Sequence, residues 1–137
     1  MDRTYSLIEI KSEVDRLAAQ IGALDHLLPT YGYSVDGARP HIEIDSGGYH
    51  FVVVERGQEI SRVTTNELDQ LLYHVFEAVT FSLACQYELE NRVKHQDFRR
   101  LMFRRQIELL SMLSPEWGEI EARDHERILG NILMMIA

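Results

Sequence analysis

The chain has 137 residues, of which 45% are hydrophobic and 26% charged, and its formal net charge at pH 7 is −8. This length and balance are typical of one globular domain with a hydrophobic core, so we expect a single domain over residues 1–137. The negative charge disfavours a nucleic-acid-binding protein, because Lys and Arg make the phosphate contacts, and it favours a cationic partner.

The first predicted element is an amphipathic helix over about residues 5–21. Its apolar side chains recur at spacings of three and four and form one stripe, made by Leu7, Ile10, Val14, Leu17 and Ile21. The apolar residues 23–30 then predict one helical turn. The Gly, Asp and Pro content of residues 31–40 predicts a loop.

A three-stranded antiparallel β-meander is predicted next. Residues 41–45 alternate between polar and apolar side chains, so Ile42 and Ile44 should face a core while the polar side chains face outward. The aromatic and β-branched residues 49–54 predict the central strand. A two-residue turn at residues 57–58, with glycine first, would lead into a third strand over residues 59–64.

Three C-terminal helices should follow. A capping-box pattern at residues 64–67 predicts the start of a helix that runs to about residue 90. The apolar stripe then fails at Asn91 and Lys94, so we expect a kink or a turn before a helix over residues 96–113, although the pattern leaves open whether the two are continuous. The pair Ser114-Pro115 predicts the start of the last helix. The predicted fold class is α+β: an N-terminal helix, the meander, and three C-terminal helices packed on one face of the sheet.

The chain ends in residues 132–137, which are nearly all apolar. We expect this segment to dock on the core, because exposed apolar patches of that size are uncommon on monomers. The alternative is a homodimer, or a self-associating structural protein, held together by the same segment.

Positive charge is concentrated in residues 92–105, which contain six basic residues and one acid, about +5, so the remainder carries about −13. The simplest interpretation is a solvated helix face whose cations pair with acids elsewhere on the molecule. A phosphate or RNA site is the alternative.

The compartment is expected to be the cytoplasm. The single cysteine, Cys85, excludes an internal disulfide and fits a reducing environment. The first residues lack a signal-peptide pattern, and no apolar run reaches the ~18 residues of a membrane span.

Four side chains of metal-ligand types lie in the meander: His41, Glu43 and Asp45 on one face of a strand, and His50 at the start of the next. Residues two apart on a strand lie about 7 Å apart, within reach of one ion. Polar residues are nevertheless ordinary on the solvent face of an antiparallel sheet, and the spacing is not that of a zinc motif. We therefore predict no enzyme, metal or cofactor, and keep a metal-dependent enzyme built on this cluster as the alternative.

The predicted loop and sheet combine aromatic, arginine and carboxylate side chains, which is the composition of a protein-binding surface for a basic partner. The candidate partner-binding residues are Tyr31, Tyr33, Asp36, Arg39, His41, Glu43, Asp45, Tyr49 and Glu55.

Four segments carry a resemblance to a known family. Residues 31–45 read Tyr-Gly-Tyr-Ser-Val-Asp-Gly-Ala-Arg-Pro-His-Ile-Glu-Ile-Asp, and residues 48–59 read Gly-Tyr-His-Phe-Val-Val-Val-Glu-Arg-Gly-Gln-Glu. Together with Asp-Gln-Leu-Leu-Tyr at 69–73 and Leu-Ser-Pro-Glu-Trp at 113–117, they resemble the immunity protein 63 family of bacterial polymorphic toxin systems.

The resemblance extends over about residues 8–127. It implies one immunity-protein domain that binds the effector domain of a cognate toxin and blocks it stoichiometrically, without catalysis. A cationic, nuclease-like toxin would fit the negative charge of the chain. The family supplies no catalytic or metal-binding residues, and the sequence leaves open the toxin's identity and activity, the residues that dominate the interface, and the oligomeric state.

Overall fold

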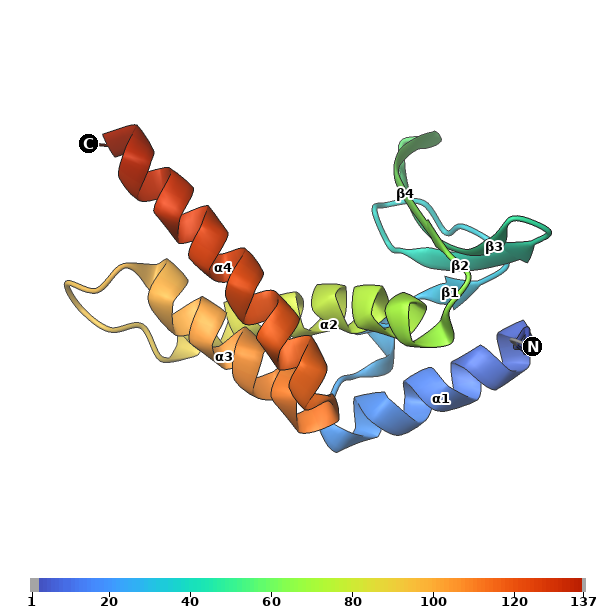
Figure 1. Cartoon of the computed structure of the whole chain (residues 1–137), viewed down its shortest axis with the longest axis horizontal. Coiled ribbons are helices and arrows are strands. Elements are labelled where there is room, and N and C mark those ends of the chain that lie inside the picture. Colours follow the sequence, from blue (N-terminus) through green and yellow to red (C-terminus); the bar gives the residue numbers. More distant parts are fainter. Residues whose placement is uncertain (1–2, 137) are drawn as a thin grey trace. The chain divides into compact units, whose positions relative to one another are not determined.

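The computed structural model describes the backbone of residues 3–136 and the side chains of residues 3–130. Its elements are α1 (Leu7–Gln20), the 3-10 turn η1 (Asp25–Leu27), β1 (Thr30–Tyr31), β2 (His41–Asp45), β3 (Gly48–Glu55), β4 (Gln58–Thr65), α2 (Leu68–Glu90), α3 (Phe98–Leu113) and α4 (Pro115–Ile136). The α+β class is confirmed (Figure 1). None of the described helices is long and apolar enough to cross a membrane.

The chain forms two compact units, an N-terminal unit (Met1–Val79) and a C-terminal unit (Thr80–Ala137), and α2 runs through the boundary. The N-terminal unit contains α1 and the sheet. The C-terminal unit contains α3 and α4. The predictions for the side chains of residues 132–137, docking on the core or pairing with a second copy, lie outside the described residues.

Helix α1 begins with a reciprocal cap that the sequence analysis missed. Ser6 Oγ accepts a hydrogen bond from the Glu9 N–H, and Glu9 Oε1 accepts one from the Ser6 N–H. The predicted apolar stripe is confirmed in its centre, because Ile10, Val14 and Leu17 are buried.

The sheet has the order β1-β2-β3-β4 over the described residues, and the predicted antiparallel meander is its β2-β3-β4 part. The prediction of three strands was incomplete, because the two-residue β1 pairs in parallel with β2 and places Thr30 beside His41. Two residues are too few to show a period, so only the long-range pairing defines this strand.

The turn between β3 and β4 is shifted by one residue from the prediction. Arg56 and Gly57 occupy it, with φ of 54° and 74°, as a type I′ turn requires, so glycine stands second. The pairing slips between Val53, opposite Ser61, and Val54, opposite Glu59. This β-bulge leaves Ile60 without a partner in the ladder and 58% exposed.

The predicted capping box at residues 64–67 was wrong. Thr64 belongs to β4, and its hydroxyl lies 2.8 Å from His50 Nδ1 instead of capping a helix. Helix α2 begins at Leu68, and Thr65 Oγ1 accepts the Glu67 N–H just before it.

In the C-terminal unit, α3 and α4 form an antiparallel hairpin (Figure 1). The predicted break before α3 is confirmed, because α2 ends at Glu90 and Asp97 caps α3 by accepting the Arg99 N–H. Ser114 caps α4 as predicted, its Oγ accepting the Trp117 N–H. The core of this unit includes Met102, Leu109, Leu110 and Trp117.

Candidate functional site

A pocket of about 320 Å³ opens in the N-terminal unit, and we name it the Tyr31 pocket. Helix α1, the η1 turn, β1 and the following loop all contribute to it. Its lining residues are Lys11, Asp15, Asp25, Leu28, Pro29, Thr30, Tyr31, Tyr33 and Arg39. The fold therefore brings together Tyr31, Tyr33 and Arg39, three of the nine residues that the sequence analysis selected.

The hydroxyl of Tyr31 is buried and has no hydrogen-bond partner among the described residues. Burial raises the pKa of this hydroxyl well above its usual range, and the carboxylates of Asp15 and Asp25 raise it further. Tyr31 is therefore a neutral group that can both donate and accept a hydrogen bond at the pocket wall.

Arg39 holds the wall of the Tyr31 pocket in place. Its Nε donates to the Leu28 carbonyl at 3.0 Å, and its Nη2 donates to the Asp25 carbonyl at 3.2 Å. On the α1 side, Lys11 pairs with Asp15 at 2.7 Å. The side chain of Asp25 makes no salt bridge within the described residues, although its charge helps to raise the pKa of Lys11.

The loop between β1 and β2 is held by hydrogen bonds at two points, while the side chain of Tyr33 is exposed. Thr30 Oγ1 donates to the Tyr33 carbonyl at 2.6 Å, while the Tyr33 side chain is 62% exposed. Asp36 accepts from the Gly57 N–H at 3.0 Å and so fastens the loop to the β3–β4 turn. Asp36 thus shapes the loop, whereas the Tyr33 side chain is exposed to solvent.

On the polar face of the sheet, the two histidines are more buried than predicted. Register places His41 between Thr30 and Val52, and it places His50 between Glu43 and Thr64. His41 and His50 are only 5% and 6% exposed, so the expectation that the polar side chains of β2 all face solvent was wrong for His41. With β1 paired to its other side, β2 is a central strand, and a central position shields a side chain more than an edge does.

Each imidazole is bound to a neighbouring carboxylate. His50 Nε2 lies 2.7 Å from Asp45 Oδ1, and His41 Nε2 lies 3.3 Å from Glu43 Oε2. The hydrogen bond from His50, with another from the Gly47 N–H, holds the pKa of Asp45 below its usual range. Glu43 also pairs with Arg62 at 3.1 Å.

The four metal-ligand types of the meander therefore fall into two separate pairs. Within the described residues, no three of these side chains bring their ligand atoms within 4.8 Å of one another. A metal ion normally takes at least three protein ligands, so the arrangement lends no support to a metal centre on the sheet.

The two remaining predicted residues lie apart from the pocket. Tyr49 is 3% exposed on the apolar face of the sheet, where its hydroxyl accepts the Tyr5 N–H at 2.8 Å. Glu55 is exposed at the end of β3.

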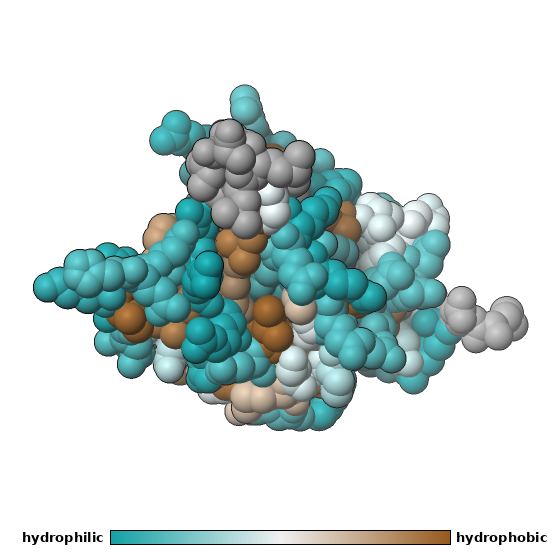
Figure 2. All heavy atoms as spheres, turned by 60° about the vertical axis from the view of Figure 1, so that its left-hand side comes forward, coloured by the Kyte–Doolittle hydropathy of each residue, from teal (hydrophilic) through white to brown (hydrophobic). Residues whose placement is uncertain are grey.

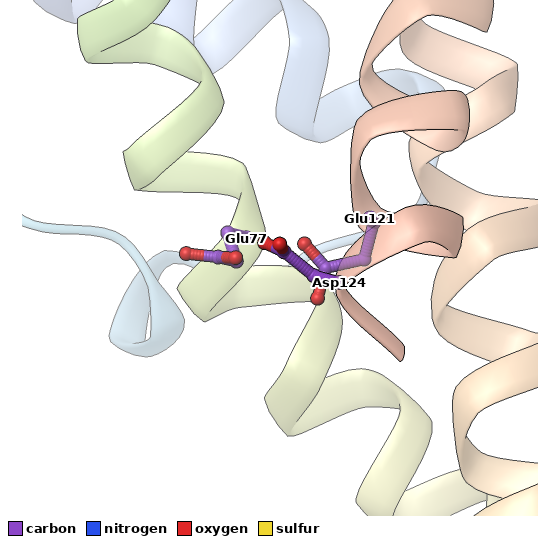
Figure 3. Close-up of side chains that lie close together, drawn as sticks. All are labelled: Glu77, Glu121 and Asp124. Carbon is purple, nitrogen blue, oxygen red and sulfur yellow. The ribbon is translucent and has the colours of Figure 1, made fainter. Parts of the chain in front are cut away.

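Three further carboxylates are drawn in Figure 3, Glu77 on α2 and Glu121 with Asp124 on α4. Each has a partner on its own helix. Tyr73 donates to Glu77 at 3.3 Å, His125 Nε2 lies 2.9 Å from Glu121, and Arg127 lies 3.5 Å from Asp124. Each of the three carboxylates therefore has a hydrogen-bond or charged partner on its own helix.

Charge separates between the two units. The N-terminal unit has six basic and thirteen acidic residues, a net of −7, and the C-terminal unit has eight basic and nine acidic residues, a net of −1. The Tyr31 pocket and the polar face of the sheet thus belong to the strongly acidic part of the chain.

Sequence reasoning missed Lys11, Asp15 and Asp25 at the pocket, and Arg62 and Thr64 on the sheet. Lys11 and Asp15 show only the i,i+4 spacing of an exposed helical ion pair, which gives no sign that they face a pocket. Thr64 could have been placed opposite His50 only with the β3–β4 register in hand, and the bulge hides that register.

Comparison with protein families gives a match to the family described as Immunity protein 63 over residues 45–127. The matched residues include β3, β4, α2 and α3, while the Tyr31 pocket lies before them. No curated protein and no solved structure matches the chain.

Proposed function

This chain belongs to the immunity protein 63 family, and we propose that it neutralises a cognate polymorphic toxin by binding the toxin's effector domain and blocking it stoichiometrically. The family match over more than half of the chain is the observation that carries the proposal. An immunity family implies a role as a binding partner rather than a catalyst. The protein would act in the cytoplasm of the cell that makes the toxin.

The net charge of −7 on the N-terminal unit supports a cationic, nuclease-like toxin as the target. Opposite charges steer two proteins into encounter and can raise the association rate by orders of magnitude. Fast association matters for an inhibitor whose target is lethal.

We infer that the toxin interface comprises the Tyr31 pocket and the polar side chains of β2, and that Thr30, which lines the pocket and pairs with His41, links the two. Tyr31 and Tyr33 are of the residue type enriched in interface hot spots, and Tyr33 is already exposed. The carboxylate of Asp25 favours a basic side chain of the toxin in the pocket. On the polar face of the sheet, Glu43 and Asp45 add acidic side chains and His41 supports Glu43, while Glu55 adds an exposed acid at the end of β3.

Asp36, Arg39 and Tyr49 have indirect roles in this proposal. Asp36 and Arg39 hold the loop and the pocket wall by accepting and donating backbone hydrogen bonds. Tyr49 is buried and tethers the start of α1 to the sheet. Substituting these three should affect binding through the shape of the surface.

The test is co-expression with the toxin domain encoded beside this gene, followed by sizing chromatography and titration calorimetry. Rescue of growth with a 1:1 complex is the expected result. Tyr33→Ala and Asp25→Asn should weaken the complex, whereas the control Met112→Ala, at an exposed position of the C-terminal unit, should not. Rescue without a complex would contradict the proposal and would turn attention to an enzyme that reverses the damage.

A further inference from the structure

A second concave surface lies in the C-terminal unit, between α3 and α4, and we name it the α3–α4 groove. Its volume is about 520 Å³. In the space-filling view, apolar atoms lie between hydrophilic side chains on the face that comes forward with α3 and α4 (Figure 2). The residues lining the groove are Asp97, Arg99, Arg100, Phe103, Arg104, Ile107, Ala122, His125, Glu126 and Leu129.

The floor of the groove is apolar and fixed in place. Phe103 stacks on His125 with ring centroids 3.9 Å apart and an angle of 19° between the planes. His125 Nε2 lies 2.9 Å from Glu121 Oε1 and 3.0 Å from Gln106 Oε1, so we assign its proton to Nε2. Because the imidazole is held by these contacts, the phenyl ring above it has a defined position.

The rim carries three arginines and two acids, Asp97 and Glu126, and Asp97 pairs with Arg99. Arg100 and Arg104 are exposed, one helical turn apart on α3, and within the described residues neither makes a salt bridge. By contrast, Arg92, Arg99 and Arg105 pair with Glu88, Asp97 and Glu108. Arg92 and Arg105 thus pair with acids outside residues 92–105, as expected, whereas the partner of Arg99 lies within that segment.

We propose that the α3–α4 groove binds an acidic, amphipathic helical segment of a protein partner. Apolar side chains of that segment would cover Phe103, Ile107 and Leu129, and its carboxylates would meet Arg100 and Arg104. From Arg100 to Ile107 the groove follows α3 for about 10 Å, the length of two helical turns. This site is separate from the one proposed for the toxin, and it does not depend on that function.

Charge and shape favour a peptide over a nucleic acid. A nucleic acid needs cations along a row of phosphates, whereas only Arg100 and Arg104 of the arginines lining the groove make no salt bridge within the described residues. One face of Phe103 is already occupied by His125, which removes that face as a base-stacking platform. The two free arginines above an apolar floor instead match carboxylates beside leucine or phenylalanine side chains.

The test uses the full chain and a fluorescein-labelled synthetic peptide of about four helical turns, with Leu and Phe on one face and Glu on its flanks. Fluorescence anisotropy should show saturable binding of this peptide, and roughly tenfold weaker binding both of a Lys-for-Glu peptide and of an Ala-for-Leu/Phe peptide. Equal binding of the Lys peptide, preferential binding of an oligonucleotide, or no binding at millimolar concentration would overturn the proposal.

A pair of double variants assigns the binding to the groove. Arg100→Gln with Arg104→Gln should weaken the acidic peptide about tenfold. Lys94→Gln with Arg123→Gln removes the same charge from exposed positions of the C-terminal unit outside the groove and should leave the affinity within about twofold. An equal loss of peptide affinity in both double variants would show that only the overall charge matters, and it would contradict the proposal that the groove is the binding site. Circular dichroism confirms that each variant is folded.

Discussion

His50 Nε2 lies 2.7 Å from Asp45 Oδ1, so the turn between β2 and β3 is closed by a bond between a buried imidazole and an exposed carboxylate. On the other side of the ring, His50 Nδ1 lies 2.8 Å from Thr64 Oγ1 of β4. One side chain of β3 thus links both neighbouring strands on the polar face of the sheet, which is part of the proposed toxin interface.

This link makes Asp45→Asn a test of acid stability. The pKa of Asp45 is lowered in the folded state, mainly by the hydrogen bond with His50. A lowered pKa stabilises the fold above the ordinary Asp value of about 3.9, and this contribution disappears as pH falls through the lowered folded-state value. Asp45→Asn should therefore lower Tm at neutral pH, and the difference from the native protein should shrink in strong acid.

Thermal unfolding followed by circular dichroism across the acid range measures this difference. Glu55→Gln is the control, because it removes an exposed acid of β3 that makes no salt bridge within the described residues. A difference in Tm for Asp45→Asn that stays constant with pH would show that the charge of Asp45 does not act through its bond with His50.

Tyr31→Phe should have opposite effects on stability and on binding. It removes a buried hydroxyl without a described partner, so the free energy of unfolding should rise by about 1 kcal/mol. If the toxin supplies the missing partner, its affinity should fall about tenfold. Urea denaturation and calorimetry with the toxin domain measure the two effects.

Tyr49→Phe is the matched control for Tyr31→Phe. Its hydroxyl accepts the Tyr5 N–H, so its removal should cost about 1 kcal/mol of stability. The same sign of the stability change in both variants would contradict the assignment of Tyr31 as the hydroxyl without a partner.

The helices were predictable from the sequence because an apolar stripe at helical spacing is a local pattern, which can be recognised without knowing the tertiary contacts. Helix α1 (Leu7–Gln20) lies inside the range predicted from such a stripe. The failures arose where a tertiary contact competes with a local pattern. Thr64 has the spacing of a helix cap, but its strand pairs with β3 and its hydroxyl faces His50.

The candidate site was likewise predictable only in part. The loop composition selected Tyr31, Tyr33 and Arg39, and the fold does gather them. Their acidic neighbours Asp15 and Asp25 come from elements whose approach to the loop has no periodic signal. Alternation along β2 placed His41 on the polar face correctly, but alternation cannot tell how well a face is covered.

Asp97 has two roles, because it caps the start of α3 and also lines the α3–α4 groove, and two substitutions separate these roles. Asp97→Ala removes the N-cap and should cost about 1 kcal/mol of stability, whereas Asp97→Asn keeps a capping oxygen and should cost much less. Both variants release Arg99 from its ion pair and should strengthen binding of the acidic peptide. Chemical denaturation and anisotropy check the two effects, and an Asn variant as unstable as the Ala variant would contradict the cap.

At Gly118, α4 approaches α3 closely. A Cβ added there would meet Ser111 Oγ, and it would lie 3.1 Å from Ser111 Cβ and 3.3 Å from Ser111 Cα. Overpacking of this kind costs about 1–3 kcal/mol, more than the ~1 kcal/mol that alanine gains over glycine in a helix. Gly118→Ala should therefore destabilise the protein, measured by urea denaturation.

Gly130 lies on the same helix, but an alanine there is expected to stabilise the protein. A Cβ there meets no described atom within 4 Å, so Gly130→Ala should stabilise by about 0.5–1 kcal/mol through helix propensity alone. Adding Ser111→Ala to Gly118→Ala removes the colliding Oγ and should recover part of the lost stability, because the two positions are coupled through their contact. If both glycine variants were stabilised, Ser111 and Gly118 would have to be farther apart than this hairpin places them.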